Sequence, residues 1–177
     1  MKMNKVAYIT VVVGGLIILL FTNATSNNSI VNEITSVEVT DSTPSVIMYN
    51  SIMKYSEEYC IPKEYAFALA YQESRYKGPA HAEYKHDVKS KAGALGPMQI
   101  MYGTAKLFVE EDERLTKKLL KTDIDLNVRL SMRILRHLKD KHGDWGKAFG
   151  AYNTGRPIIN RYAKNILNLK YNWIQFS

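Results

Sequence analysis

A glutamate occupies a position where the helical pattern would favour a hydrophobic residue. After Pro62, Ala66, Leu69 and Ala70 recur at helical spacing, and the next position on that apolar face is Glu73. Burial and the carboxyl end of a helix both disfavour an ionised carboxyl group, so both raise its pKa. A glutamic acid that stays protonated near neutral pH can protonate a departing glycosidic oxygen. Glu73 is therefore the candidate general acid and base, the alternative being a helix-end glutamate that faces water.

Short motifs follow one another along the chain around this glutamate. Ser74 comes directly after Glu73, residues 90–101 read SKAGALGPMQIM with Thr104-Ala105 beyond them, and residues 151–155 read AYNTG. In this order they resemble the soluble lytic transglycosylase family, which is related in fold to goose-type lysozymes. That family combines Glu-Ser, Ser-x-x-Gly-Ala-x-Gly-Leu-Met-Gln and Ala-Tyr-Asn-x-Gly motifs. The resemblance covers residues 44–167, and residues 125–127 (DLN), before a long helical stretch, also fit it.

The resemblance implies a role for each matching residue. Ser90 and Gln99 would hydrogen-bond near the catalytic glutamate and the bound sugar, and Met101 would line the cleft. Tyr152 would place its hydroxyl close to that glutamate and to the substrate acetamido group, while Asn153 would brace the turn. Amide, hydroxyl and phenol groups are suitable hydrogen-bond partners for sugar hydroxyl and N-acetyl groups. In the alternative interpretation, Tyr152 and Met101 belong only to the core.

The chain departs from the family pattern in three places. Pro97 stands where the family usually has leucine, and Tyr102-Gly103 replaces a common Pro-x. Residues 78–89 form an apparent insertion between the glutamate and the second motif. His81 and His86 lie in this insertion, but their spacing matches no metal site, so we interpret them as surface residues. We predict no metal and no cofactor.

The resemblance implies a reaction that uses a single carboxyl group, because it supplies no second one across the sugar. The expected reaction cleaves the β-1,4 bond between N-acetylmuramic acid and N-acetylglucosamine of peptidoglycan and forms a 1,6-anhydro end. One alternative is a goose-type-like lysozyme that hydrolyses the same bond, with Glu83 or Asp87 activating water. Another is an inactive wall-binding assembly protein. A basic nucleic-acid binder is disfavoured, because aromatic residues are not interleaved with the arginines of the long helix.

The elements that would position these residues are mainly helices. Helical patterns begin at Pro44 and Pro62, and Leu126, Leu130 and Ile134 mark a long amphipathic helix that ends at Gly143. Shorter helices are predicted over residues 104–109, 145–152 and 157–167, and residues 77–97 form an irregular segment or a short hairpin. The predicted fold is mainly α, a lysozyme-like helical domain over residues 44–177.

The amino terminus has the pattern of an export signal or a membrane anchor. Lys2 and Lys5 precede the apolar residues 6–21, which would reach about 24 Å as a helix, short of a hydrocarbon core of about 30 Å. We therefore assign residues 1–21 to a signal peptide or transmembrane anchor helix and residues 22–43 to a polar linker. The expected location is the inner membrane facing the periplasm, or the periplasm after export.

Composition agrees with one small domain but does not choose its partner. The 177 residues carry a net charge of +7, which suits any polyanion, including the bacterial wall. The expected partners are peptidoglycan glycan strands and, through the amino-terminal segment, the membrane; no nucleic acid is expected, and the protein should be a monomer. A small catalytic domain without a separate wall-binding module suits phage lysis or the assembly of a secretion apparatus.

Overall fold

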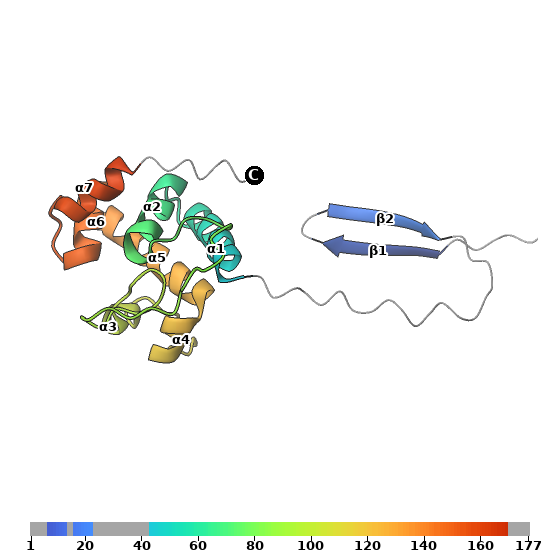
Figure 1. Ribbon diagram of the computed structural model, residues 1–177, viewed down its shortest axis with the longest axis horizontal. Coiled ribbons are helices and arrows are strands. Elements are labelled where there is room, and N and C mark those ends of the chain that lie inside the picture. The colour runs from blue at the N-terminus through green and yellow to red at the C-terminus, as the bar shows by residue number, and fades with distance from the viewer. Residues whose placement is uncertain (1–6, 14–15, 23–42, 170–177) are drawn as a thin grey trace, which may run out of the picture. The chain divides into compact units, whose positions relative to one another are not determined.

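The structure is a computed structural model that describes residues 7–13, 16–22 and 43–169. The chain divides into two compact units, Met1–Thr40 and Asp41–Ser177. The first unit contains an antiparallel pair of strands, and the second contains the helices (Figure 1).

The first unit differs from the helix expected over residues 6–21. Strand β1 (Ala7–Val13) pairs with β2 (Leu16–Thr22) in a register that places Ala7 opposite Thr22 and Val13 opposite Leu16. The segment is rich in valine and isoleucine, whose branched side chains favour strands, and two glycines separate the strands in the sequence. The structure therefore does not confirm the anchor helix that the sequence analysis expected here. In the described part of the chain, no helix is long and apolar enough to cross a membrane.

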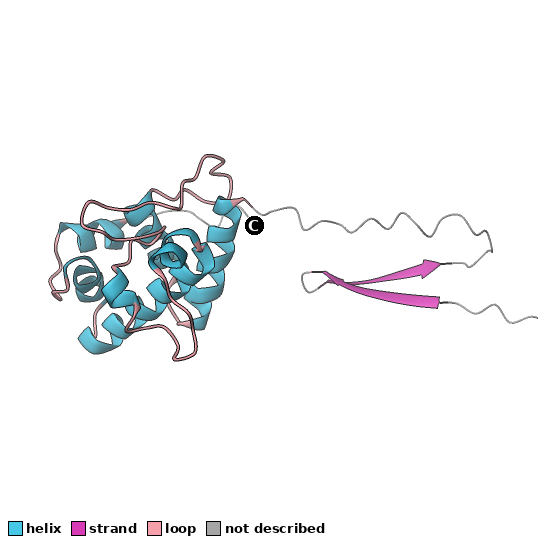
Figure 2. Cartoon of the chain, turned by 90° about the horizontal axis from the view of Figure 1, so that it is seen from below, coloured by secondary structure: helices cyan, strands magenta, loops and turns pink. Residues whose placement is uncertain are grey.

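The second unit confirms a mainly α fold (Figure 2). Its helices are α1 (Pro44–Glu58), α2 (Lys63–Ser74), α3 (Tyr102–Ala105), α4 (Lys117–Thr122), α5 (Ile124–His142), α6 (Trp145–Thr154) and α7 (Arg161–Asn168). Helix α5 packs against α1, α4 and α6, while α7 packs against both α2 and α6. These contacts make α5 the central helix and bring α2, from the start of the domain, beside α7 at its end.

Helix α5 shows why the sequence folds this way locally. Asp123 caps its amino end by accepting a hydrogen bond from the Leu126 backbone N–H at 3.0 Å, and Gly143 ends it in the left-handed conformation. Leu130 and Ile134, on the predicted apolar face, are buried, whereas Arg133 is half-buried at the side. The amphipathic pattern therefore predicted both the helix and its buried face.

Helix α2 brings the predicted general acid to the interior. All five residues 66–70 are buried, and the helix ends at Ser74 because Arg75 adopts a left-handed conformation with φ of 60°. Glu73 therefore lies in the last turn, near the helix carboxyl end, as the sequence predicted.

Between α2 and α5 the structure has the irregular segment that was one of the two predicted alternatives. Residues 77–100 contain only isolated bridges, Lys89 with Leu95 and Leu95 with Ile100, and no regular hairpin. Helix α3 is only four residues long and ends before Val109, and α4 was not predicted. The Thr116 side chain caps the amino end of α4 by accepting a hydrogen bond from the Leu119 N–H. This helix start was missed because the sequence after Thr116 is short and rich in lysine.

Candidate active site

A cavity of about 290 Å³ brings together all the residues that the sequence assigned to the site. Those residues are Glu73, Ser90, Gln99, Met101, Tyr152 and Asn153, and Ala92, Ala94, Ile100, Thr104 and Ile134 complete the lining. They come from α2, the irregular segment, α3, α5 and α6, so the tertiary fold assembles the cavity from distant parts of the chain. Their placement agrees with the expected site, while their roles stay predictions.

Glu73 is the carboxyl group of this cavity. Burial is the main cause that raises its pKa from 4.5 to about 7, although the hydrogen bond from Tyr162 and the positive charge of Arg75 act in the opposite direction. Near neutral pH, a group with this pKa is present in both the protonated and the ionised form. Glu73 can therefore donate a proton and afterwards accept one.

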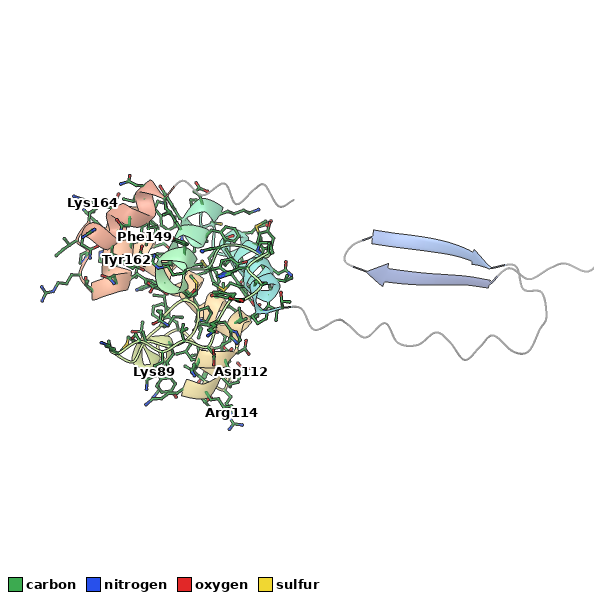
Figure 3. The ribbon with its side chains drawn as sticks, in the orientation of Figure 1. Lys89, Asp112, Arg114, Phe149, Tyr162 and Lys164 are labelled. Atoms are coloured by element: carbon green, nitrogen blue, oxygen red, sulfur yellow. The ribbon has the colours of Figure 1, made fainter. Side chains whose placement is uncertain are left out.

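Tyr162, on α7, holds the Glu73 carboxyl group and was missed by the sequence analysis. Its phenol donates a hydrogen bond to Glu73 Oε1, and its own pKa lies well above 10, first because it is buried. Figure 3 shows Tyr162 on the α7 helix together with Lys164, whose exposed side chain lies at the outer edge of the domain. Tyr162 lies one turn before the buried Ile166, which predicts an inward side chain, but only the packing of α7 on α2 reveals its partner.

The second motif forms another wall of the cavity through a tight turn. Ser90 Oγ accepts a hydrogen bond from the Ala94 backbone N–H at 3.0 Å, and Gln99 Nε2 donates to the Gly96 carbonyl at 2.8 Å. Gln99 itself has φ of 50°, a left-handed conformation that is uncommon for a residue with a side chain. Both polar side chains thus support the turn that presents them to the cavity.

Asn127 fixes this turn to the central helix and was not assigned a role from the sequence. Its side-chain amide donates to the Leu95 carbonyl at 3.0 Å and the Leu120 carbonyl at 2.8 Å, and its Oδ1 accepts from the Met98 N–H at 2.8 Å. Asn127 is fully buried, and a Cβ atom at Gly96 would lie 2.4 Å from its Nδ2. The glycine of the motif is therefore required by the close approach of the amide.

The Tyr152 hydroxyl has two hydrogen-bond partners that the sequence did not reveal. It donates to the Met98 carbonyl at 2.8 Å and lies 2.9 Å from Ser131 Oγ, so it is bound to the turn and to α5. Burial is the main cause that raises the Tyr152 pKa, and the nearby Glu73 charge adds to it. Both side chains line the same cavity, so Tyr152 lies close to Glu73 as the resemblance implied, while its hydrogen bonds go to Met98 and Ser131.

A second hollow of about 800 Å³ continues from the cavity. The two share Met101, Thr104, Ile134, Tyr152 and Asn153, and the second is also lined by residues that include Phe108, Arg133 and His137. Met101 is 47% exposed, so it forms the surface between the two hollows. Together they provide an extended groove on one side of the glutamate.

The other acids considered from the sequence lie apart from this groove. Glu83 and Asp87 are exposed and line neither hollow, and Asp87 is 3.7 Å from Lys121. Within the described ranges, no group of three His, Cys, Asp or Glu side chains is arranged to hold a metal ion. The site that the structure describes therefore depends on one carboxyl group.

Comparisons with known proteins agree with this geometry. The family model of the transglycosylase SLT domain matches residues 50–173. The chain is 26% identical to a solved lytic transglycosylase Slt from Pseudomonas aeruginosa, an inactive glutamate-to-glutamine mutant, with a TM-score of 0.51 over 60% of this chain and 16% of that one. A search of curated proteins finds no significant match.

A second solved relative is the 70 kDa soluble lytic transglycosylase from Escherichia coli. The identity is 28% and the TM-score 0.51, over 67% of this chain and 18% of that one, and a complex of the 70 kDa enzyme with bulgecin A gives the same values. The chain thus spans less than a fifth of the length of these relatives. Fold and site define the class as a lysozyme-like lytic transglycosylase domain. The chain belongs to the transglycosylase SLT domain family.

Proposed function

We propose that this protein is a peptidoglycan lytic transglycosylase in which Glu73 is the general acid and base. The observation that carries the proposal is a half-buried carboxyl group whose burial raises its pKa to about 7, in a cavity where no other residue of the lining is acidic. Family membership supports the class of enzyme, and the groove beyond Met101 offers room for further sugars of a glycan strand.

In the proposed reaction, protonated Glu73 first donates its proton to the oxygen that joins N-acetylmuramic acid to N-acetylglucosamine. The bond from that oxygen to the anomeric carbon breaks, and the acetamido oxygen of the muramic acid residue stabilises the cationic carbon. The Glu73 carboxylate then accepts the proton of the same sugar's 6-hydroxyl as its oxygen attacks the anomeric carbon. The product is a 1,6-anhydro end, and no water is consumed.

The arrangement favours this reaction over hydrolysis. A two-carboxylate hydrolase needs a second acid about 5 to 10 Å from the first, across the sugar. Glu83 and Asp87, the candidates in the sequence, are exposed side chains outside both hollows. The solved Slt from Pseudomonas aeruginosa supports an essential glutamate by analogy, since its glutamate-to-glutamine form is called inactive.

Product analysis tests the proposal directly. Purified cell wall would be digested with the full chain, and the soluble fragments would be examined by mass spectrometry before and after borohydride reduction. The proposal expects fragments that are one water lighter than the hydrolytic products and resist reduction. Fragments with reducible muramic acid ends would assign the hydrolase instead, and an absence of soluble fragments would support the inactive wall-binding alternative.

We further propose that the protein is exported and acts as a monomer on the wall, either held at the inner membrane or released into the periplasm. Lys2, Lys5 and the apolar run after them support export, because the positive residues would stay in the cytoplasm. Fractionation with amino-terminal sequencing tests this. Full-length protein in the membrane indicates an anchor, a shortened periplasmic chain indicates a cleaved signal, and full-length cytoplasmic protein contradicts both.

A further inference from the structure

The insertion of residues 78–89 is unexplained by the proposed reaction, since none of its residues lines either hollow. It is nevertheless hydrogen-bonded to three parts of the domain. Ser45 Oγ, at the start of α1, donates to the Pro79 carbonyl at 2.9 Å, and the Gly96 N–H of the motif turn donates to the Val88 carbonyl at 2.9 Å. The third contact is made by Tyr84.

Tyr84 is an almost fully buried residue in a segment with many exposed side chains. Its side chain is 6% exposed, and its ring packs edge-on against Tyr76 with centroids 5.0 Å apart. Its hydroxyl lies 2.7 Å from Ser74 Oγ. Burial raises the Tyr84 pKa to about 12, so the hydroxyl is neutral and can either donate to or accept from the serine.

Ser74 is the residue that links this contact to the active site. It is the last residue of α2 and directly follows Glu73, and its Oγ also lies 3.2 Å from the Ala70 carbonyl of the preceding turn. Beyond it, Arg75 leaves the helical conformation, so the helical hydrogen bonds end here. The last turn of a helix frays when nothing holds it, and in α2 that turn carries the catalytic carboxyl group.

We propose that Tyr84 is a positioning residue for Glu73, acting through its hydrogen bond to Ser74. The inference rests on the proposed function, because it assumes that Glu73 is the acid and base. The tyrosine holds the last turn of α2 in the orientation that directs the Glu73 carboxyl group at Tyr162 and into the cavity. Because the same insertion also binds Gly96 through Val88, it ties the glutamate wall to the motif turn on the other side.

The spacing of the two walls matters because proton transfer depends steeply on geometry. A misplacement of about 1 Å at a catalytic group can cost about a hundredfold in rate. Removing one hydrogen bond from a turn that is otherwise packed should cost less, about tenfold in kcat. Substrate binding across the rest of the groove should be unchanged, so KM should stay the same.

The experiment compares Tyr84→Phe with Tyr76→Phe, using soluble glycan chains and a measure of total bond cleavage that counts both anhydro and reducing ends. Tyr76 is a matched control because its buried hydroxyl also makes a 2.7 Å hydrogen bond, but donates it to the Ser45 carbonyl and not to Ser74. Both variants should lose similar stability on urea unfolding. Only Tyr84→Phe should lose about tenfold in kcat. The upper limb of its pH–rate profile should also move to lower pH, because greater access of water to Glu73 lowers the pKa of this carboxyl group.

Ser74→Ala removes the same hydrogen bond from its other end and provides a second route if Tyr84→Phe does not fold. It should give the same loss of kcat, and the double variant should lose no more than either single one. Equal kcat losses in Tyr84→Phe and Tyr76→Phe, or additive losses in the double variant, would overturn the proposal. The assay measures total cleavage, so hydrolytic products would refute the transglycosylase reaction alone. The kcat comparison between the tyrosine variants would still test the positioning role.

Discussion

The two walls of the catalytic cavity are built in different ways. The glutamate wall consists of regular helices, with Glu73 on α2 and Tyr162 on α7. The turn wall is the irregular turn with Ser90 and Gln99, where side-chain hydrogen bonds, above all those of Asn127, add to backbone ones.

The difference shows that the site meets two requirements with separate structures: a raised pKa for the acid and polar groups at fixed positions. Packed apolar helices around Glu73 exclude water, and this burial sets the pKa of the acid. The turn is instead held by the buried Asn127 amide and presents polar groups at fixed positions. In a regular helix or strand, the backbone polar groups would be used in the hydrogen bonds of the element itself. In the proposed mechanism the helical wall carries the chemistry and the turn carries recognition, so variants in each wall should fail differently.

The largest effect is expected from Glu73→Gln. The amide has nearly the same shape and can still accept the Tyr162 hydrogen bond, but it cannot donate and recover a proton, so activity should fall by at least about a thousandfold. Glu83→Gln, at an exposed position, is the matched control and should keep full activity. Release of soluble fragments from cell wall measures both. Substantial activity in a folded Glu73→Gln protein would remove Glu73 from the mechanism.

Asn127→Leu should weaken the turn wall most. The substitution keeps the volume but leaves the Met98 N–H and the Leu95 and Leu120 carbonyls buried without their partner, which should cost about 3 to 5 kcal/mol of the unfolding free energy. Asn165→Leu, on the exposed side of α7, should change stability by less than about 0.5 kcal/mol. Urea unfolding measures both changes. Equal effects would show that the amide is not what holds the turn.

The pH dependence of stability should reveal the burial of Glu73. Its pKa is raised from 4.5 to about 7 in the folded state, so the folded protein holds this proton more tightly than the unfolded chain. Unfolding free energy should therefore fall as pH rises from 4.5 to about 7, by about 3 kcal/mol relative to Glu73→Gln, and the difference should be constant above that. Denaturant midpoints of both proteins across this window test it. Parallel profiles would mean that Glu73 is not buried.

The smallest effect is expected from Tyr162→Phe. Loss of one hydrogen bond to Glu73 should lower kcat by about fivefold. Because that bond lowers the Glu73 pKa, its removal should move the upper limb of the pH–rate profile to higher pH. Tyr65→Phe is a suitable control, since its ring packs against Trp145 and Phe149 outside both hollows. An unmoved limb in Tyr162→Phe would exclude direct contact with the acid.

Several parts of the molecule were predictable because their causes are local. The start of α1 at Pro44, the end of α5 at Gly143 and the buried face of α5 follow from capping residues and helical periodicity. Glu73 could be singled out because it continues an apolar face. The amino-terminal strands were missed because a short apolar run does not distinguish a helix from a strand by its pattern alone.

The sequence by itself therefore determined the helical class and the motif residues that line the cavity, and it singled out Glu73 as the candidate acid. Only the tertiary structure decided that Tyr162 binds this acid, that Asn127 holds the facing turn, and that the Tyr152 hydroxyl binds Met98 and Ser131. The physical reason is that a hydrogen bond between residues far apart in the chain depends on how whole helices pack. Helical periodicity predicts which face of a helix points inward. The hydrogen-bond partner of a side chain on that face is set by the crossing of α7 with α2 and of α5 with α6.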